Sequence, residues 1–383
     1  MLALTGGRIA DVTGTRRADV AIEDGRIVAV GDVADADRTV DVSGQVVAPG
    51  LVDSHVHLFM DGRPDAESMR DESVETATYR AAANLRTALD AGVTAVRDLG
   101  APGTVALDAK AAVEDGVLPG PRVLAAGQNI TMTGGHGHWI GTEADGPAAV
   151  RKAAREQVKR GADVVKCMAT GGVLTTGAQT GAPELTQEEL EALVEAASAK
   201  DVPTSAHAHG EVGIQNAVRA GITSIEHGTF MDRETAELMV DHGTYWVPTA
   251  SALHGIVEHG VEAGIPEQAV AKAEDATDRF EDAFRHALDA GVTIAMGTDA
   301  GTPFNFFADV PSELELMVEY GMSPAEALES ATVTAADLLG LDDVGRVAEG
   351  FRADLVVLGD DPNEDATAWG DPDRVLVDGQ FHR

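Results

Sequence analysis

Residues 46–57 read Val46-Val47-Ala48-Pro49-Gly50-Leu51-Val52-Asp53-Ser54-His55-Val56-His57, an apolar run with a Pro-Gly turn that ends in two histidines. The apolar part is typical of a buried β-strand. Residues i and i+2 of a strand point to the same face, so His55 and His57 could bind one metal ion together. Alone, the pair fits a strand with two exposed histidines equally well.

Four further polar residues lie at or near the ends of apolar runs, and most are followed by glycine-containing loops. They are Lys166, His207, His227 and Asp299. With the histidine pair they form a ligand set for two divalent cations, which favours hydrolysis by metal-activated water. The tetrapeptide around Asp299 is by itself also compatible with a turn or a helix cap.

Lys166 is the unusual member, because an ammonium group repels a cation. Its neighbours Val164, Val165 and Met168 predict burial, which favours the neutral amine. A neutral amine can add carbon dioxide, and the two oxygens of the carbamate could bridge two metals. The alternative is a lysine that extends from a strand end to solvent. Cys167, the single cysteine, should face the opposite side of the strand and excludes an intrachain disulfide.

Strand, loop and helix patterns alternate between residue 46 and about residue 339. The strand candidates are residues 50–58, 93–99, 123–130, 163–169, 203–208, 222–226, 245–249 and 292–297. Eight such units in this length predict an α/β fold, a (β/α)8 TIM barrel over residues 46–349. In that fold the carboxyl ends of the strands share one rim, so the six candidate ligands would converge.

The two chain ends have a different pattern. Residues 1–45 and 350–383 contain short β-like pieces separated by Asp-Gly and Ser-Gly turns. Neither segment is long enough to bury a core alone. We therefore expect them to form one composite β-sandwich domain whose sequence is interrupted by the barrel.

The formal net charge is −36, and the acidic residues are scattered along the chain. This charge opposes nucleic acid and anionic membranes as partners and is compatible with a salty cytoplasm, as in a halophile. No apolar stretch is long enough to span a membrane, and no leader precedes the first strand. We expect a cytoplasmic homo-oligomer that acts on a small molecule.

Several motifs together resemble the metal-dependent amidohydrolase superfamily over nearly the whole chain. They are residues 48–57, Val96-Arg97-Asp98-Leu99-Gly100, Gly134-Gly135-His136-Gly137, residues 166–172 and Gly350-Phe351-Arg352-Ala353-Asp354-Leu355-Val356. The closest branch is imidazolonepropionase-like and includes Xaa-Pro dipeptidases. Imidazolonepropionase itself is mononuclear and lacks the bridging lysine, so Lys166 favours the binuclear, peptidase-like side.

The resemblance implies a role for each ligand. His55, His57 and Asp299 would hold the more buried metal, His207 and His227 the second, and a carboxylated Lys166 would bridge two divalent ions, zinc first. A hydroxide would attack a carbonyl carbon, and Asp299 would transfer its proton to the departing nitrogen.

Other residues are candidates for substrate contact. His136 is expected to contact a carboxylate or carbonyl group, whereas His138 could equally be a rim histidine. His209 stands where dipeptidases often have a tyrosine that binds the substrate carboxylate, which leaves dipeptide preference open. Arg97 and Asp98 point to opposite strand faces, so only one can face the interior. The glycine-rich residues 171–181 predict a mobile lid.

The predicted reaction is hydrolysis of a carbon–nitrogen bond in a small carboxylate-bearing substrate, such as a dipeptide or an N-acyl amino acid. A cyclic amide or lactam hydrolase and a deaminase are alternatives, because the same metals serve all three. A non-catalytic scaffold is disfavoured, since such barrels usually lose ligands and none is missing here.

Overall fold

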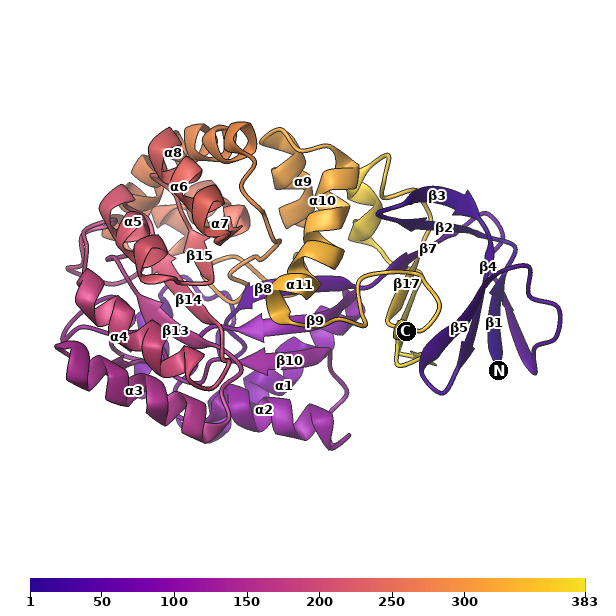
Figure 1. Ribbon diagram of the computed structural model, residues 1–383, viewed down its shortest axis with the longest axis horizontal. Coiled ribbons are helices and arrows are strands. Elements are labelled where there is room, and N and C mark those ends of the chain that lie inside the picture. The colour runs from indigo at the N-terminus through magenta and orange to yellow at the C-terminus, as the bar shows by residue number, and fades with distance from the viewer. Residues whose placement is uncertain (383) are drawn as a thin grey trace.

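The computed structural model describes residues 1–382. Strands and helices alternate through the central part of the chain, and both termini lie in a smaller part made of strands (Figure 1). The strands are β1 (Leu2–Thr5), β2 (Arg8–Asp11), β3 (Gly14–Arg17), β4 (Asp19–Glu23), β5 (Arg26–Gly31), β6 (Arg38–Asp41), β7 (Val46–Pro49), β8 (Leu51–Val56), β9 (Val93–Asp98), β10 (Arg122–Ala125), β11 (Ile130–Thr131), β12 (Thr142–Glu143), β13 (Val165–Met168), β14 (Thr204–Ala208), β15 (Ser224–His227), β16 (Tyr245–Val247), β17 (Leu355–Leu358), β18 (Arg374–Val377) and β19 (Gln380–Phe381).

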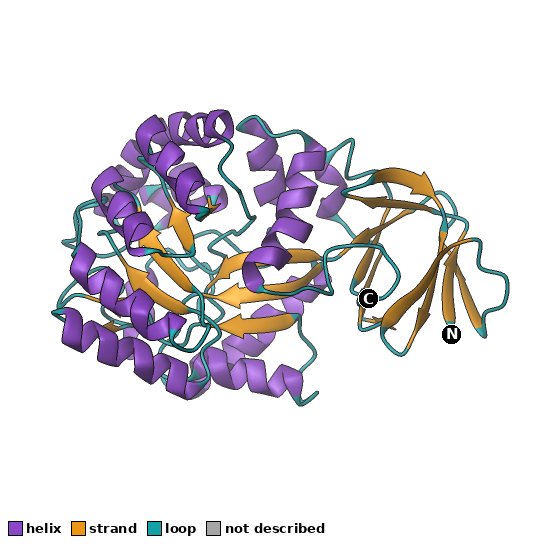
Figure 2. Ribbon diagram, viewed as in Figure 1, coloured by secondary structure: helices purple, strands orange, loops and turns teal. Residues whose placement is uncertain are grey.

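The helices follow the strands of the central part and surround them (Figure 2). The α-helices are α1 (Val74–Asp90), α2 (Val105–Glu114), α3 (Pro147–Arg160), α4 (Gln187–Ser198), α5 (Glu211–Ala220), α6 (Arg233–His242), α7 (Ala250–His259), α8 (Glu267–Ala290), α9 (Ser312–Glu319), α10 (Pro324–Glu329) and α11 (Ala335–Leu339). Three 3₁₀ helices, η1 (Ala66–Asp71), η2 (Val261–Ala263) and η4 (Ala366–Gly370), and the π-helix η3 (Ser330–Thr334) complete the set.

Local sequence explains where several helices begin and end. The Thr186 side chain and the Glu189 side chain form a capping box that starts α4. Helices α3, α5 and α8 end at Gly161, Gly221 and Gly291, whose φ angles of 96°, 89° and 80° lie in the left-handed region. These stops return the chain to the next strand after each helix.

The central strands form two parallel sheets, in the orders β10-β9-β8 and β12-β11-β13-β14-β15-β16. The predicted α/β class with parallel strands is therefore confirmed. A single closed ladder of eight strands is not formed among the described residues, because the hydrogen-bonded strands are interrupted at two places.

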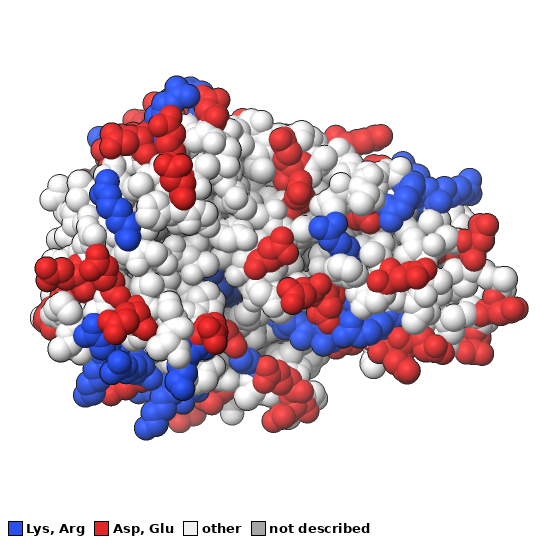
Figure 3. All heavy atoms as spheres, in the orientation of Figure 1, with Lys and Arg blue, Asp and Glu red and all other residues white. Residues whose placement is uncertain are grey.

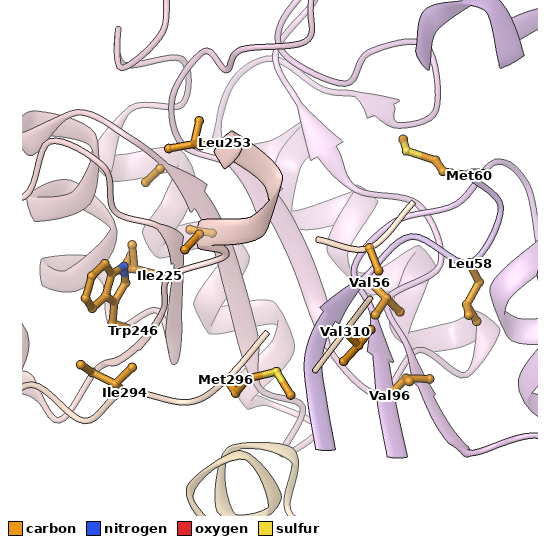
Figure 4. Packing of buried hydrophobic residues seen from close by; sticks show 14 of the residues in the cluster. Val56, Leu58, Met60, Val96, Ile225, Trp246, Leu253, Ile294, Met296 and Val310 are labelled. Atoms are coloured by element: carbon orange, nitrogen blue, oxygen red, sulfur yellow. The ribbon is translucent and has the colours of Figure 1, made fainter. Parts of the chain in front are cut away.

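The first interruption lies at residues 292–297, which were predicted to be a strand. This segment makes one isolated parallel bridge, from Ile294 to Trp246, and a second bridge follows it, from Ala300 to Val56. The segment lies between β16 and β8, and Met296 occupies the space between Trp246 and Val56 (Figure 4). The apolar pattern predicted its burial correctly but not its lack of continuous pairing.

The second interruption lies within residues 123–130, which were predicted to be one strand and instead form β10 and β11. Gly127 between them has a φ of 71°, which breaks the extended conformation. The chain still stays close to its neighbour, since Asp163 N donates to Ala125 O at 2.9 Å.

The smaller part contains a four-stranded sheet, β5-β4-β1-β6, and a six-stranded sheet, β19-β18-β17-β7-β2-β3. Strands from both chain ends pair in the second sheet, where β17 lies antiparallel to β7. Leu4, Ile9, Val47 and Leu355 belong to one buried cluster that joins the two ends. The sheet includes β7, so it extends a few residues past the boundary expected after residue 45.

Acidic side chains spread over the face seen in Figure 3, whereas basic side chains gather over α3. The acidic surface agrees with the net charge of −36. Among residues 1–382, no helix combines the length and the apolar character that crossing a membrane requires.

Candidate metal centre

The six predicted ligands line one cavity; five lie on or just after parallel strands, and Asp299 follows the segment 292–297. They are His55 and His57 at β8, Lys166 on β13, His207 on β14, His227 on β15 and Asp299 after residues 292–297. The strand register places Met168 beside His207 and Ala208 beside His227. The structure therefore brings together all six side chains selected from the sequence.

The first group of possible ligands contains His55, His57 and Asp299, and all three side chains are buried. Asp299 Oδ1 lies 3.3 Å from His55 Nε2 and 3.3 Å from His57 Nε2. The carbonyl oxygen of Gly100 can only accept, so His57 Nδ1 donates to it at 2.7 Å. This hydrogen bond leaves the Nε2 lone pair of His57 directed at the cavity.

The backbone is strained at this site. His227, Thr249 and Asp299 have φ angles of 71°, 54° and 60°, a region that residues other than glycine seldom adopt. The Asp299 N–H donates to His55 O at 2.7 Å, which holds the strained residue beside the first group. Such strain concentrates at functional sites, where the surrounding structure fixes it.

The second group contains His207, His209 and His227, also buried. His227 Nδ1 lies 2.7 Å from Thr249 Oγ1, whose own proton is donated to Pro248 O at 2.7 Å. Thr249 must therefore accept from His227, which leaves the Nε2 lone pair of His227 free to bind a metal.

His209 was predicted to contact substrate, and the structure places its ring with the second group, stacked 4.9 Å from the His227 ring. His209 Nδ1 lies 2.7 Å from Thr229 Oγ1. The Thr229 hydroxyl has no other hydrogen bond within residues 1–382, so it can donate to His209 Nδ1. In that arrangement the Nε2 proton of His209 is available to a ligand in the cavity.

Lys166 is buried, and its Nζ has no hydrogen-bond partner among the described residues. Burial lowers its pKa to about 8, although the carboxylates of Glu226 and Asp299 oppose this effect. Lys166 therefore has far more neutral amine near neutral pH than a lysine with the ordinary pKa.

Several buried polar atoms that face the cavity have no aligned hydrogen-bond partner among residues 1–382. They include Lys166 Nζ, His207 Nε2 and Asp299 Oδ1. An unsatisfied buried polar atom costs about 1–3 kcal/mol, more when charged. The unpaired imidazole nitrogen of His207 lies in one group and the unpaired carboxylate oxygen of Asp299 in the other, and divalent cations would satisfy both.

Sequence reasoning assigned no role to Glu226 and left Arg97 and Asp98 undecided. Arg97 points to the interior and donates from Nη2 to Glu226 Oε1 at 3.1 Å, while Asp98 accepts from the backbone N–H groups of Leu58 and Gly100. Burial alone would raise the pKa of Glu226, but Arg97 and His55 lower it well below its usual range. A charged residue in a buried apolar strand was the available signal.

His136 and His138 were both candidates for substrate contact, and the structure separates them. The His136 ring lies 4.2 Å from the His207 ring and lines the cavity, and burial lowers its pKa to about 3. His138 Nδ1 lies 3.0 Å from Gly135 O in its own loop, and its side chain does not line the cavity. Substrate contact by His138 is therefore not supported.

The rest of the cavity lining is largely apolar. It includes Met60, Trp139, Ile140, Met168, Val173, Leu174, Leu253 and Ile256. Part of this lining comes from residues 171–181, the predicted lid. Lys272 of α8 donates to the carbonyl oxygens of Gly172 and Thr175 at 3.2 and 3.0 Å, which attaches the loop to the helix.

Comparison with known proteins is consistent with this geometry. The model of the Amidohydrolase family matches residues 46–381. Ochratoxinase from Aspergillus niger is 33% identical over 402 residues, covering 94% of this chain and 81% of the relative. Imidazolonepropionase from Cutibacterium acnes is 30% identical over 398 residues, covering 96% and 91%.

Solved structures give the same result for the fold. The crystal structure of a Xaa-Pro dipeptidase with bound methionine in its active site superposes with a TM-score of 0.94 at 34% identity. The match covers 100% of this chain and 99% of that one. The similarity therefore includes both the central sheets and the smaller part.

Proposed function

The chain belongs to the amidohydrolase family and is a hydrolase that acts on carbon–nitrogen bonds, and on that premise we propose its substrate and metal requirement. The proposed substrate is a small amide with a free carboxylate and an apolar group, such as a dipeptide or an N-acyl amino acid. The observation that supports this proposal most is one cavity lined both by two groups of possible metal ligands and by apolar side chains.

Two divalent metal ions, zinc first, fit the donor set. His55, His57 and Asp299 would hold one ion, and His207 and His227 the other. Lys166 would join both as a carbamate: its neutral amine adds carbon dioxide, an N–C bond forms and one proton is released. When bound, the metals supply an activated water at neutral pH and polarise a carbonyl group.

Asp299 is the proposed proton carrier. Burial alone would raise its pKa, but His55, His57 and Lys166 hold that pKa below its usual value, so the carboxylate is ionised. It can therefore accept a proton from the attacking water and deliver it to the departing nitrogen. Its Oδ1 atom has no competing aligned hydrogen bond among residues 1–382.

The substrate carboxylate is proposed to meet His136 and His209. Burial lowers the pKa of His209 to about 4, and His136 is also neutral at pH 7, so each ring can donate a single N–H. Thr175 Oγ1 lies 2.8 Å from His136 Nδ1, as Thr229 does from His209, and a hydroxyl donor at Nδ1 leaves the proton on Nε2. The apolar wall around Leu253 would hold the adjoining side chain.

The named relatives support this class of substrate and one alternative. A relative solved as a Xaa-Pro dipeptidase with methionine in its active site favours a dipeptide or amino-acid amide. The 30% identity with imidazolonepropionase keeps a cyclic amide as the second candidate. A deaminase or a non-catalytic scaffold has no comparable support among these relatives.

The finer architecture is also proposed. The two parallel sheets would be parts of one (β/α)8 barrel, with residues 292–300 filling the place between β16 and β8. The two sheets of the smaller part would form a composite β-sandwich from both chain ends. A crystal structure would test both, since backbone pairing around the complete rim defines a closed barrel.

The proposed function can be tested on purified protein grown with zinc and bicarbonate. Elemental analysis should find two metal ions per chain. A panel of dipeptides, N-acyl amino acids and lactams should show the highest kcat/KM for an acyl amino acid with an apolar group. No metal, or activity confined to lactams, would contradict the proposal. Asp299→Asn is the matched variant that identifies background hydrolysis.

A further inference from the structure

Glu226 is a buried carboxylate that the proposed reaction does not use. It lies on β15, next to His227, and is fully buried without lining the cavity. Three donors converge on its Oε1 atom: Arg97 Nη2 at 3.1 Å, Ser205 Oγ at 2.8 Å and Ser224 Oγ at 2.6 Å. Its other oxygen is left for a different partner.

That partner is His55. Glu226 Oε2 lies 3.0 Å from His55 Nδ1, an ion-pair distance that is not aligned as a hydrogen bond. Neither atom has another hydrogen-bond partner among residues 1–382. A carboxylate accepts and never donates when ionised, so the imidazole nitrogen that faces it must carry the proton. The opposite nitrogen, Nε2, faces Asp299 at 3.3 Å.

We propose that Glu226 is a positioning residue that fixes the tautomer of His55, with the proton on Nδ1 and the Nε2 lone pair directed into the cavity. Second-sphere carboxylates act on histidine ligands in this way: they set ring orientation and raise basicity. The inference rests on the proposed function only in taking His55 as a metal ligand, because the tautomer itself exists without metal.

Arg97 also helps to position His55, through the backbone of the preceding residue and through Glu226. Its Nε donates to the carbonyl oxygen of Ser54 at 2.6 Å, while its Nη2 holds Glu226. The guanidinium is planar and rigid, so it fixes the distance between the backbone that carries His55 and the carboxylate that faces the His55 ring. Ser54, His55, Arg97 and Glu226 thus form one buried unit.

The simpler explanation is a buried ion pair between Arg97 and Glu226 that only stabilises the fold. Glu226→Gln separates the two explanations, because the three donors on Oε1 also orient the new amide. Its carbonyl oxygen must take the Oε1 place, which turns the NH₂ group toward His55 Nδ1. The amide then donates to Nδ1, the His55 proton moves to Nε2, and that nitrogen can no longer bind a metal.

The first experiment uses the metal-free wild-type protein. Long-range ¹H–¹⁵N NMR of the imidazole rings shows which nitrogen carries the proton, with His55→Asn identifying the signals. We expect His55 to be protonated at Nδ1. Protonation at Nε2 would overturn the proposal. This measurement does not depend on activity, so it distinguishes failure of the inference from failure of the proposed function.

The second experiment measures zinc affinity of Glu226→Gln by equilibrium dialysis, with Ser205→Ala as the matched control. Ser205→Ala removes one hydrogen bond from the same carboxylate but keeps an acceptor facing His55. We expect affinity at one of two sites to fall about 10–100-fold in Glu226→Gln and to stay near wild type in Ser205→Ala. Wild-type zinc affinity at both sites of Glu226→Gln, or equal losses of zinc affinity in both variants, would refute the positioning role. If Glu226→Gln does not fold, the wild-type NMR result decides.

Discussion

Carbon dioxide should modify Lys166 selectively in the metal-free protein, with a pH dependence set by burial. Carbamate formation requires the neutral amine. With a pKa of about 8, Lys166 is about one-tenth neutral at pH 7 and about nine-tenths neutral at pH 9. A lysine with the ordinary pKa of 10.5 has about 300-fold less neutral amine at pH 7. Modification should therefore rise about tenfold per pH unit below 7 and level off above 9.

The assay is ¹³C NMR of metal-free protein equilibrated with ¹³C-bicarbonate from pH 6 to pH 9. Lys166→Met should remove the carbamate signal, and the methionine side chain adds no charge to the cavity. Lys272→Met is the matched control: burial also lowers the pKa of Lys272, but its Nζ donates to backbone carbonyl oxygens and favours the charged form. The signal should persist in that variant.

Two results would refute this reasoning. One is a carbamate signal that survives in Lys166→Met, which would place the modification on another amine, such as the chain terminus. The other is a signal that appears only near pH 10, which would mean that Lys166 is solvated and not buried in the apolar strand. In either case the bridging role of Lys166 would lose its physical basis.

Four further outcomes follow from the same site and surface. Asp299→Asn should lower kcat about 10²–10⁴-fold while circular dichroism stays unchanged, since an amide cannot accept the proton; near wild-type turnover would exclude Asp299 as proton carrier. His209→Ala should raise KM more for carboxylate substrates than for their amides, and equal effects would show that His209 does not contact the carboxylate. Chelation should lower Tm, because ligand at about 1,000 times Kd adds about 4 kcal/mol of stability; an unchanged Tm in calorimetry would mean that no metal was bound. Salt should raise Tm, because the screening length falls from about 30 Å at 0.01 M to about 3 Å at 1 M and repulsion between acidic groups weakens. A Tm that does not change with salt in calorimetry would show that the charge of −36 does not destabilise the fold.

The candidate ligands could be identified from the sequence because each is a polar residue within or just after an apolar run. A polar residue at the end of a buried strand has few explanations, and parallel strands bring such ends to one edge. His55, Lys166, His207 and Asp299 are polar residues within or just after such apolar runs, and the structure places them around one cavity. No long-range information was needed for that step.

Strand continuity was harder to predict because it depends on partners far away in the sequence. Residues 292–297 have the apolar pattern of a strand, but the segment makes a single isolated bridge, from Ile294 to Trp246. Gly127 divides another predicted strand through one positive φ angle. Periodicity reports burial, whereas pairing depends on register and on the path of the neighbouring chain.

The orientation of Arg97 illustrates the same limit at a single side chain. Alternation along the strand required Arg97 and Asp98 to face opposite sides but could not assign the sides. The choice is made by Glu226, 129 positions along the chain, which accepts the guanidinium inside the protein. A buried arginine needs such an acceptor, so the orientation of Arg97 could be predicted only together with the position of Glu226.

Burial has two opposite effects in this centre. It leaves polar atoms such as His207 Nε2 without partners, which costs stability in the metal-free protein. It also lowers the pKa of His55 to about 4 and the pKa values of His207 and His227 well below their usual value, so these imidazoles stay neutral. His57 is the exception, because Asp299 raises its pKa despite burial. Neutral nitrogen is the form that binds a metal, so the burial that destabilises the empty cluster also keeps protons from competing for it.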